Sequence, residues 1–371
     1  MEFKNSGAKP INKKPRVSFI HGRLGPHIMH GRLAKSIGGE FQMVDKYKIW
    51  NDREYGKLYT IFAWFYNAFA FKKPESYDYF LVSGPHFSPI IMKIFRLKKR
   101  QKVMVHLGDE TMYFLYDRWY SPFMRKLLIT LLNRYDVLLC EGQMANDLAG
   151  LNGINKPLRF TTYLGVPKER LNKLLEVKPR QEVNHFIFIS TGPGGWRTYY
   201  KGIDLMIESF SKAFNERDDL RFSIVGKWNE DVQEDLLKNC SKACQEAITF
   251  LGHTNDIDAL IKEGCFYLHT ARGDAFPTVV LEAMTAGLIP LISEWTGSKE
   301  YVKKVNESFI IPLDQEVVTR NILRFADFTA EERKSYSDRS REVAKEFTEE
   351  FALKHYRDTF ETIQKEVHQA R

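Results

Sequence analysis

The sequence contains two series in which short apolar runs alternate with helix-like patterns. In the first series, the apolar runs are residues 17–20, 41–44, 79–82, 103–106 and 137–140. In the second series, they are residues 185–190, 221–225, 248–251, 266–269 and 288–292. This alternation predicts parallel sheets with helices on both faces and ligands at the carboxyl ends of the strands. We therefore expect an α/β protein of two similar domains that face each other across a cleft.

The stretch between the two series is polar, charged and poor in apolar residues, which places the expected linker at 171–184. The first domain is then expected at 15–170 and the second at 185–350, with a further helical pattern within 351–371. Residues 1–14 are basic and lack the apolar core of a signal peptide, so we expect a disordered lead-in.

The four cysteines indicate whether the protein works in a reducing or an oxidising compartment. Cys140, Cys240, Cys244 and Cys265 are expected to be free thiols in a reducing cytoplasm. A metal pair at Cys240 and Cys244 is the alternative, but no second pair or nearby histidine completes four ligands. No stretch offers about 20 uninterrupted apolar residues, so the sequence predicts no spanning helix. We expect a cytoplasmic protein.

Positive charge is concentrated in the first half of the chain. Residues 1–170 contain 28 Lys and Arg against 14 Asp and Glu, whereas residues 171–371 contain 27 against 33. The basic run 94–102 and the aromatic run 59–71 could together rest on the inner face of an anionic membrane. The alternative is a solvated basic face and a buried aromatic helix. Nucleic acid is not expected, because no recognition module accompanies the basic residues.

Residues 269–302 predict a loop, a short helix and a buried strand. Pro277 and Thr278 suit the start of the helix. Asp274 lies in the loop before it and Glu282 just beyond its first turn. A phosphate bound at the helix N-terminus would then have a carboxylate on either side. This arrangement suits a ligand with a sugar, a diphosphate and a ribose in a row; the alternative is an ordinary surface helix.

A second pattern of the same kind precedes the helical pattern 202–210. Arg197 and Lys201 lie four residues apart, beside the glycines Gly194 and Gly195. Two cations and several free N–H groups match a diphosphate, whose charge grows as a sugar leaves it. The alternative is a pair of exposed cations.

Both patterns resemble a known family. The stretch from Asp274 to Gly287 resembles the E-x7-E signature of retaining GT-B glycosyltransferases, especially glycosyltransferase family 4, with Asp274 in place of the first glutamate. The stretch from Arg197 through Lys201 to Phe210 resembles the Arg…Lys-Gly segment of that family. The resemblance implies two Rossmann-like domains in the GT-B arrangement. It also implies transfer, with retention, of a sugar from a UDP- or GDP-sugar to a glycan or lipid-linked acceptor in cell-surface polysaccharide or glycolipid synthesis.

The resemblance further implies roles for individual residues. Arg197 and Lys201 would bind the leaving diphosphate, and Glu282 would bind the ribose. Asp274 and His106 would contact the transferred sugar, although a lone histidine at a strand end also has a purely structural interpretation. Other implied donor contacts are Gly25, Gly194, Gly195, Leu251, His253, Ala275, Phe276, Pro277 and Thr278. The helix within 351–371 would cross back to the first domain.

The acceptor is expected in the first domain, at His27, Asp109 and Glu110; the two acids are otherwise explained as residues that start a helix. His27 and its neighbours His21 and His30 are interpreted as loop or acceptor-cleft residues. We do not expect them to bind metal, because no acid or cysteine lies near them in the sequence.

No metal or other cofactor is expected, and Arg197 and Lys201 would replace a divalent ion at the diphosphate. The segment Asp256-Ile-Asp258 has the spacing of a metal-binding D-x-D motif, but it opens a helical pattern, so capping explains it. No strong base is evident.

Two other functions are compatible with the same motifs. One is another GT-B enzyme, such as an epimerase or a phosphorylase. An epimerase needs an acid–base pair around the sugar, which we do not identify, and a phosphorylase usually has a cofactor-binding lysine segment, which we do not find. The other is a non-catalytic nucleotide-sugar-binding subunit, which would not require both the acid pair and the cation pair.

Overall fold

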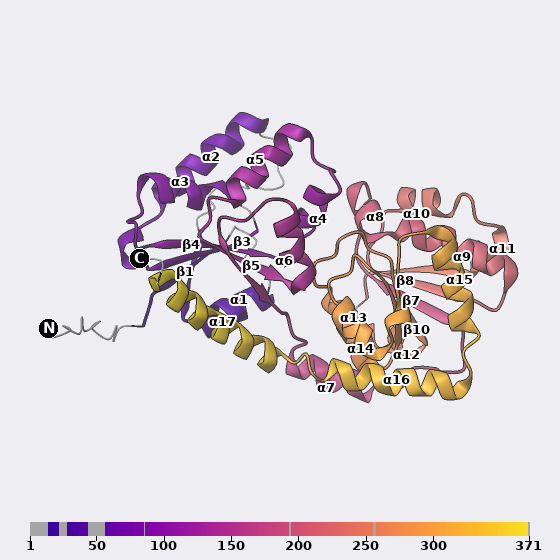
Figure 1. Cartoon of the computed structure of the whole chain (residues 1–371). Coiled ribbons are helices and arrows are strands. Elements are labelled where there is room, and N and C mark those ends of the chain that lie inside the picture. Colours follow the sequence, from indigo (N-terminus) through magenta and orange to yellow (C-terminus); the bar gives the residue numbers. More distant parts are fainter. Residues whose placement is uncertain are drawn as a thin grey trace.

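The structure, a computed structural model, describes residues 14–21, 28–43, 56–84, 86–192, 194–254 and 257–369. Two six-stranded parallel sheets form the centres of two domains (Figure 1). This confirms the expected α/β fold with two Rossmann-like domains. The lead-in that the sequence predicts to be disordered lies, apart from Lys14, outside the described residues.

The first sheet has the strand order β2-β1-β3-β4-β5-β6. Its strands are β1 (Val17–His21), β2 (Gly39–Met43), β3 (Tyr79–Ser83), β4 (Lys102–Leu107), β5 (Val137–Glu141) and β6 (Leu158–Thr162). The four inner strands are almost entirely buried, as parallel strands covered on both faces should be. Phe19 of β1 belongs to one hydrophobic core and its neighbour Ile20 to another, so the sheet separates two cores.

Helices cover both faces of this sheet. Figure 1 shows α2, α3 and α5 on one side and α1 on the other. The helices of this domain are α1 (Ile28–Ser36), α2 (Gly56–Ala70), α3 (Phe87–Phe95), α4 (Thr111–Tyr116), α5 (Pro122–Leu132) and α6 (Gly142–Leu151), with a 3₁₀ turn at Pro74–Ser76.

The second sheet has the strand order β12-β11-β10-β7-β8-β9. Its strands are β7 (His185–Ile189), β8 (Arg221–Val225), β9 (Ile248–Gly252), β10 (Phe266–His269), β11 (Ile289–Ser293) and the two-residue β12 (Ile310–Ile311). Its helices are α8 (Trp196–Lys201), α9 (Ile203–Glu216), α10 (Glu230–Leu237), α11 (Lys242–Ala247), α12 (Ile257–Lys262), α13 (Thr278–Ala286), α14 (Lys299–Val305), α15 (Gln315–Ala326) and α16 (Ala330–Ala344), with a 3₁₀ turn at Glu307–Phe309.

Helix α13 has the boundaries that its sequence predicts. Pro277 is its N-cap, and Gly287 is its C-cap with φ of 92° in the left-handed region, where glycine is favoured. The strand β11 follows directly, so the C-terminal domain presents the start of α13 at the carboxyl end of the neighbouring strand β10. This is the edge of a parallel sheet at which ligands bind.

The expected linker is half helical. Residues Lys168–Glu176 form α7, in which Leu171 and Leu174 are buried, and α7 packs against α13. The stretch reads as polar because only one face of this short helix is apolar. The second crossing between the domains follows α16 and leads into α17 (Glu349–Gln369).

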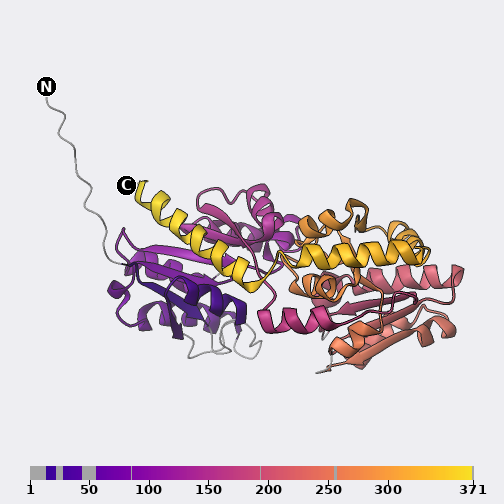
Figure 2. The same cartoon turned by 90° about the horizontal axis from the view of Figure 1, so that it is seen from below.

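Helix α17 lies against the N-terminal domain, as Figure 2 shows from below. Its Phe360 is in edge contact with Tyr79 of β3, with ring centroids 5.1 Å apart, and its Glu349 pairs with Arg32 of α1 at 2.7 Å. The two chain crossings also touch, because Val166 and Thr348 form a parallel β-bridge. Both connections between the domains therefore lie side by side.

Glycines allow the domains to approach closely. A Cβ at Gly142, which begins α6, would lie 3.0 Å from the carbonyl oxygen of Ala275 in the other domain. A Cβ at Gly273 would overlap the side chain of Tyr113 in α4. The Tyr199 hydroxyl donates a hydrogen bond of 3.1 Å to Asp117 across the same boundary.

The structure bears on two expectations, one for the cysteines and one for a membrane-spanning helix. All four cysteines are buried free thiols. In the described part of the chain, no helix combines the length and the apolar character that crossing a membrane requires.

Candidate active site

A cavity of about 570 Å³ lies between the two domains. The N-terminal domain contributes His30, Gly108, Glu141 and Leu164 to its lining. The C-terminal domain contributes Ile189, Ser190, Thr191, Arg197, Lys201, Val225, Gly226, His253, Thr254, Ile257, Asp274, Phe276, Pro277, Thr278 and Val279. Ile189, Val225 and Glu141 are the last residues of their strands, so the cavity lies at the carboxyl ends of both sheets.

The structure brings half of the residues predicted to contact the donor to this cavity. Seven predicted residues line it, namely Arg197, Lys201, His253, Asp274, Phe276, Pro277 and Thr278. The part of the lining that the structure describes does not include His106, Asp109, Glu110, Gly194, Gly195, Leu251, Ala275 or Glu282. Gly25 and His27, predicted to contact donor and acceptor, lie outside the described residues.

Lys201 and Asp274 form a buried ion pair, with Nζ 2.6 Å from Oδ2. The Asp274 carboxylate also receives hydrogen bonds from Tyr200, at 3.2 Å on Oδ1, and from His269, at 3.2 Å on Oδ2. Burial alone would raise the pKa of Asp274, but Lys201 and His269 together hold that pKa well below its usual range. Asp274 is therefore an ionised group, and its ion pair holds the Lys201 ammonium in place at the cavity.

Tyr200 and His269 are contacts that the sequence did not single out. His269 is fully buried, and burial lowers the pKa of its imidazole despite the carboxylate beside it. His269 is the last residue of strand β10, next to the predicted loop, and Tyr200 directly precedes Lys201. Both residues are therefore close in sequence to residues that the motifs identified. A search for polar residues at strand ends would have found His269.

The loop between β7 and α8 presents Arg197. The Nε of Arg197 donates a hydrogen bond of 3.0 Å to the carbonyl oxygen of Thr191, which fixes the guanidinium at the cavity. Gly194 and Gly195 have φ of 109° and 62°, the left-handed region that favours glycine. Arg197 and Lys201 are one helical turn apart on α8, so the two cations converge on one side of the cavity.

Glu282 is held by an arginine from the crossing helix α7. Its Oε2 accepts a hydrogen bond of 3.1 Å from Nε of Arg170, which also pairs with Asp258 of α12. Burial raises the pKa of Glu282, although Arg170 opposes this shift. Glu282 lies one turn beyond Thr278 on α13, so it is on the face that leads to the cavity. The Asp258 of the D-x-D segment thus has a structural partner, and Asp256 lies outside the described residues.

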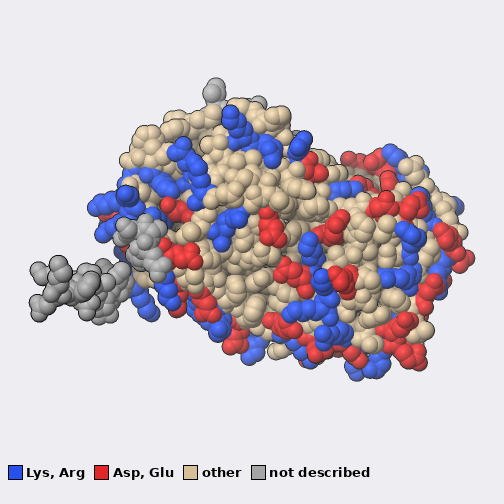
Figure 3. All heavy atoms as spheres, viewed as in Figure 1, with Lys and Arg blue, Asp and Glu red and all other residues tan. Residues whose placement is uncertain are grey.

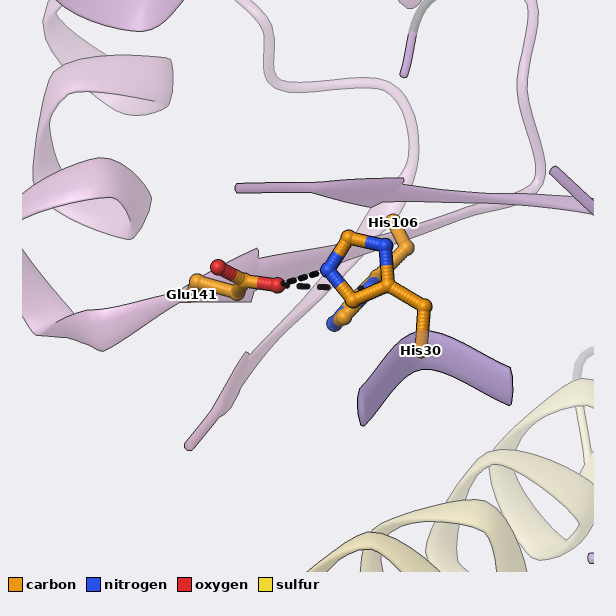
Figure 4. A group of neighbouring side chains, drawn as sticks. All are labelled: His30, His106 and Glu141. Carbon is orange, nitrogen blue, oxygen red and sulfur yellow. Dashed lines mark hydrogen bonds and ion pairs between the residues drawn. The ribbon is translucent and has the colours of Figure 1, made fainter. Parts of the chain in front are cut away.

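Three side chains meet at the N-terminal side of the cavity, as Figure 4 shows. Nε2 of His30 and Nδ1 of His106 lie 2.5 Å and 3.5 Å from the same oxygen of Glu141. The sequence has no acid near His21, His27 and His30, but the fold brings Glu141 against His30. Glu141 lies 111 positions from His30, and the parallel pairing of β4 with β5 brings it beside His106.

The cluster of His30, His106 and Glu141 differs from a metal centre in the distance between His30 and Glu141. The three potential ligand atoms lie within 4.8 Å of one another. However, 2.5 Å between His30 and Glu141 is a hydrogen-bond distance. Two ligand atoms on a tetrahedral zinc ion are about 3.3 Å apart. His106 is almost completely buried, and its Nε2 lies 3.1 Å from the Thr162 hydroxyl. His106 therefore contacts the cluster and not the cavity.

Asp109 and Glu110 lie at the start of α4. Asp109 accepts a hydrogen bond of 3.0 Å from the backbone N–H of Thr111, as expected of a residue that starts a helix. Burial, together with the charge of Asp109, raises the pKa of Glu110 to about 7. The charges of Arg197 and Asp274, which belong to the C-terminal domain, also act on this pKa.

The comparisons agree with this architecture. Structural similarity places the chain in the class of GT-B folds. The protein Alr3699/HepE of Anabaena, solved in complex with UDP and glucose, aligns with a TM-score of 0.68 and 16% sequence identity, covering 94% of this chain and 100% of that chain. Residues 186–327, within the C-terminal domain, match the family model described as "Glycosyl transferases group 1".

Two curated relatives match over shorter regions. An uncharacterized glycosyltransferase of Haemophilus influenzae is 28% identical over 148 residues, which cover 39% of this chain and 38% of that protein. The phosphatidylinositol N-acetylglucosaminyltransferase gpi3 subunit of Schizosaccharomyces pombe is 23% identical over 196 residues, covering 52% and 41%. The chain thus spans less than half the length of the curated relatives that it matches.

Proposed function

We propose that the protein is a retaining glycosyltransferase that moves a sugar from a UDP- or GDP-sugar to a hydroxyl of a glycan or lipid-linked acceptor. One observation carries this proposal. Arg197 and Lys201 line the same interdomain cavity as Pro277 and Thr278 at the start of α13. Two cations and a helix N-terminus then surround the place where a diphosphate would lie.

The Lys201 ammonium suits this role. It has three N–H donors, and its ion pair with Asp274 uses one of them, so the same ammonium can also donate to a phosphate oxygen. Because Asp274 keeps Lys201 in place before substrate arrives, little reorganisation is needed as charge develops on the leaving group. Retention, and contact of Asp274 with the sugar, are implied by the family resemblance, whereas the structure places His106 behind the cavity lining, in contact with Glu141.

The nucleoside would lie toward Glu282 and His253. His253 lines the cavity, and Glu282 follows on the same face of α13. Ribose hydroxyls would compete with Arg170 for the Glu282 carboxylate. HepE binds UDP, which supports a uridine donor, and GDP-sugars remain the second choice. We propose that no metal serves the diphosphate, since Arg197 and Lys201 supply the positive charge there.

Contact with an anionic membrane surface is the second part of the proposal. The outer faces of α2 and α3 expose large apolar side chains, with Phe62 and Phe95 at 63% and 61% exposure. The other exposed members are Ile61, Phe65, Phe69 and Ile94. Lys72, Lys73, Lys98, Lys99 and Arg100 follow these two helices in sequence. Figure 3 shows this part of the surface as largely uncharged, with Lys and Arg beside it.

This surface favours peripheral attachment over a buried aromatic helix. In α2, Ala63, Asn67 and Ala68 face the protein while the phenylalanines face outward. Apolar side chains bordered by basic residues suit insertion at the boundary between headgroups and acyl chains. Such attachment fits a cytoplasmic enzyme that works at the inner face of the membrane. It also fits a lipid-linked acceptor in cell-surface polysaccharide or glycolipid synthesis.

The donor assignment is tested with nucleotides and one pair of variants. UDP-glucose, UDP-N-acetylglucosamine and GDP-mannose are screened by thermal stabilisation of the wild-type protein. Lys201→Ala should lose this stabilisation and abolish turnover of the donor, with an unchanged circular dichroism spectrum. Lys212→Ala is the matched control, because Lys212 forms only an exposed ion pair with Glu316. Near-normal turnover in Lys201→Ala would contradict the diphosphate assignment.

Metal independence is tested by chelation. Turnover of the bound nucleotide sugar should be unchanged after treatment with excess chelator, since no divalent ion is assigned to the diphosphate. A strict requirement for added metal would count against the proposal.

A further inference from the structure

A second cavity, of about 540 Å³, lies on the N-terminal domain beside α5. Its described lining has no residue in common with that of the interdomain cavity. Arg118 and Tyr120, from the segment between α4 and α5, form one side of it, and Arg125, Lys126 and Ile129 of α5 contribute to the other. In the part of this lining that the structure describes, there are three cations and no carboxylate.

The three cations have no acidic partner among the described residues. Arg125 donates from Nε to the carbonyl oxygen of Leu115 at 2.9 Å and from Nη2 to the amide oxygen of Asn152 at 3.5 Å, and both of these partners are uncharged. Arg118 and Lys126 are exposed, and no carboxylate in the described part of the chain forms an ion pair with either of them. Three positive charges around one hollow repel one another and are stabilised by a multiply charged anion, of which phosphate is the usual example.

The backbone of Arg118 supports a role for this side chain. Arg118 follows Asp117, the C-cap of α4, and has φ of 57°, in the left-handed region. The Trp119 N–H donates to the carbonyl oxygen of Phe114 at 3.0 Å and so closes the end of the helix. Glycine is favoured at this position because other residues adopt the conformation only at a cost. An arginine kept here has its side chain presented at a fixed point of the cavity rim.

The same segment contacts the helix that carries the cations of the donor site. The Trp119 ring stacks between two others, with centroids 5.2 Å from Phe114 and 4.9 Å from Tyr199 of α8. Arg197 and Lys201 belong to the same helix α8. The second cavity is thus adjacent to a contact between the domains, on the N-terminal side of the proposed donor site.

The acids predicted to contact the acceptor act on the lining of the second cavity. Burial raises the pKa of Tyr120 to about 12, and the charges of Asp109 and Glu110 add to this shift. A neutral sugar can donate hydroxyl hydrogen bonds to these carboxylates, whereas they repel a phosphate. An acceptor with both parts is therefore oriented, with its sugar toward the acids and its phosphate toward the three cations.

Apolar side chains border the cations on the outer surface. Phe123 and Met124, directly before Arg125 on α5, are 74% and 40% exposed. Helix α5 also lies on the same side of the first sheet as α2 and α3, which form the surface proposed for membrane contact (Figure 1). A phosphate that joins a sugar to a lipid would have its apolar chain at this surface.

We propose that Arg118, Arg125 and Lys126 bind a phosphate group of the acceptor, which is therefore a phosphate or diphosphate ester of a sugar. This assignment rests on the proposed glycosyl transfer and specifies the substrate class of its acceptor side. A lipid-linked ester and a soluble sugar phosphate share this chemistry, and the exposed Phe123 and Met124 favour the lipid-linked ester.

The test is calorimetric titration of the full-length protein with pyrophosphate. The wild type should bind two pyrophosphates, one at Arg197 and Lys201 and one in the second cavity. In the double variant Arg118→Gln/Lys126→Gln, binding at one site should weaken by more than about tenfold, because two charge-assisted hydrogen bonds are lost. Its circular dichroism spectrum and its stabilisation by UDP should be unchanged, since both side chains are exposed and the donor contacts lie in the other domain.

The matched control is the double variant Lys156→Gln/Arg357→Gln. It removes the same two charges from exposed positions outside the cavity, and it should keep both pyrophosphate sites. An equal loss of affinity in the two double variants would reduce the effect to net charge and would overturn the proposal.

Two further probes distinguish the sources of the phosphate. Vesicles of phosphatidylcholine contain either phosphatidic acid or, at equal surface charge, phosphatidylserine. A preference for phosphatidic acid that Arg118→Gln/Lys126→Gln removes would support a lipid-linked ester. Binding of glucose 1-phosphate that the same variant removes, without a preference among vesicles, would support a soluble sugar phosphate. A wild type that shows neither would overturn the proposal.

The failure of this assignment is distinct from that of the proposed function. A wild type that binds a single pyrophosphate, lost in Lys201→Ala and kept in Arg118→Gln/Lys126→Gln, would refute the second site and leave the donor site intact. A wild type that is neither stabilised by UDP-glucose, UDP-N-acetylglucosamine or GDP-mannose nor able to hydrolyse them would refute the glycosyltransferase, and with it the acceptor role of the second site.

Discussion

The two domains share one architecture but present opposite chemistry to the cavity between them. Each has six parallel strands, and in each the cavity lies at the carboxyl ends. The C-terminal domain presents the cations Arg197 and Lys201, whereas the N-terminal domain presents the imidazole–carboxylate pair His30 and Glu141. The first pair suits a charge that develops on a leaving group, whereas the second pair holds an imidazole against a buried carboxylate. The same sheet thus serves two different tasks according to the residues at its strand ends.

The largest expected effect concerns the buried ion pair of the C-terminal domain. Asp274→Asn leaves the Lys201 ammonium without its charged partner in a buried position, where loss of one member costs about 3–5 kcal/mol of unfolding free energy. Urea denaturation should show this loss, and donor hydrolysis should fall by more than about 10²-fold. Glu316→Gln removes the exposed pair with Lys212 and should cost no more than about 1 kcal/mol. Equal costs for the two variants would contradict the role of Asp274.

The next largest effect concerns liposome binding, and it tests whether the basic surface of the N-terminal domain differs in function from that of the C-terminal domain. Replacing Lys98, Lys99 and Arg100 by Gln should weaken binding to liposomes that contain anionic lipid by more than tenfold, at about 1 kcal/mol for each basic residue near the surface. Donor hydrolysis in solution should not change. The control replaces Lys238, Lys303 and Lys334 of the C-terminal domain, which are also exposed. Liposome binding that falls equally in both variants would favour a solvated basic face without a membrane role.

A smaller effect is expected at Gly108, beneath the N-terminal cluster. In Gly108→Ala the added methyl group overlaps the carboxylate of Glu141 and displaces it. We expect a loss of about 1–3 kcal/mol in unfolding free energy, typical of overpacking, and a fall in donor hydrolysis with unchanged stabilisation by UDP. A variant with full hydrolysis activity would show that Glu141 need not be held where the structure places it.

The smallest expected effect is a difference between His30 and Asp274 in how their contributions to stability depend on pH. The pKa of His30 is raised in the folded protein, so its stabilising contribution is complete below pH 6.5 and is lost as the pH rises through the folded-state pKa. The pKa of Asp274 is lowered, so its contribution is complete above its usual value of 3.8 and is lost only as the pH falls through the folded-state pKa.

Urea denaturation between pH 5 and pH 9 measures this difference. The stability gap between the wild type and His30→Gln should shrink as the pH rises through the raised pKa of His30. The gap between the wild type and Asp274→Asn should stay constant. A gap for His30→Gln that widens toward alkaline pH would mean that the pKa of His30 is lowered and not raised.

The two sites also differ in how far they could be predicted. Arg197 and Lys201 are four residues apart, and Asp274 lies just before α13, so local patterns sufficed to identify them and the helix that they flank. The cluster of His30, His106 and Glu141 joins residues from α1, β4 and β5. Only the pairing of strands brings them together, and no spacing along the chain records that pairing.

The contact of Glu282 with Arg170 and the helix α7 in the expected linker could not be predicted, for a related reason. Arg170 lies in a stretch of low apolar content, and its contact with Glu282 depends on α7 packing against α13. Two buried leucines, Leu171 and Leu174, are too few for a single sequence to distinguish a short amphipathic helix from a polar connection. The two-residue strand β12 is likewise too short to be distinguished by its pattern.

The absence of a side chain at Gly142 has a consequence for how such a protein could be controlled. Its backbone is near the carbonyl oxygen of Ala275 in the other domain, and it directly follows Glu141, the N-cap of α6. A single bulky residue there would push the two domains apart, separating the His30–Glu141 pair from the cations Arg197 and Lys201 while leaving each pair intact. The approach of the two halves therefore depends in part on a position that carries no functional group at all.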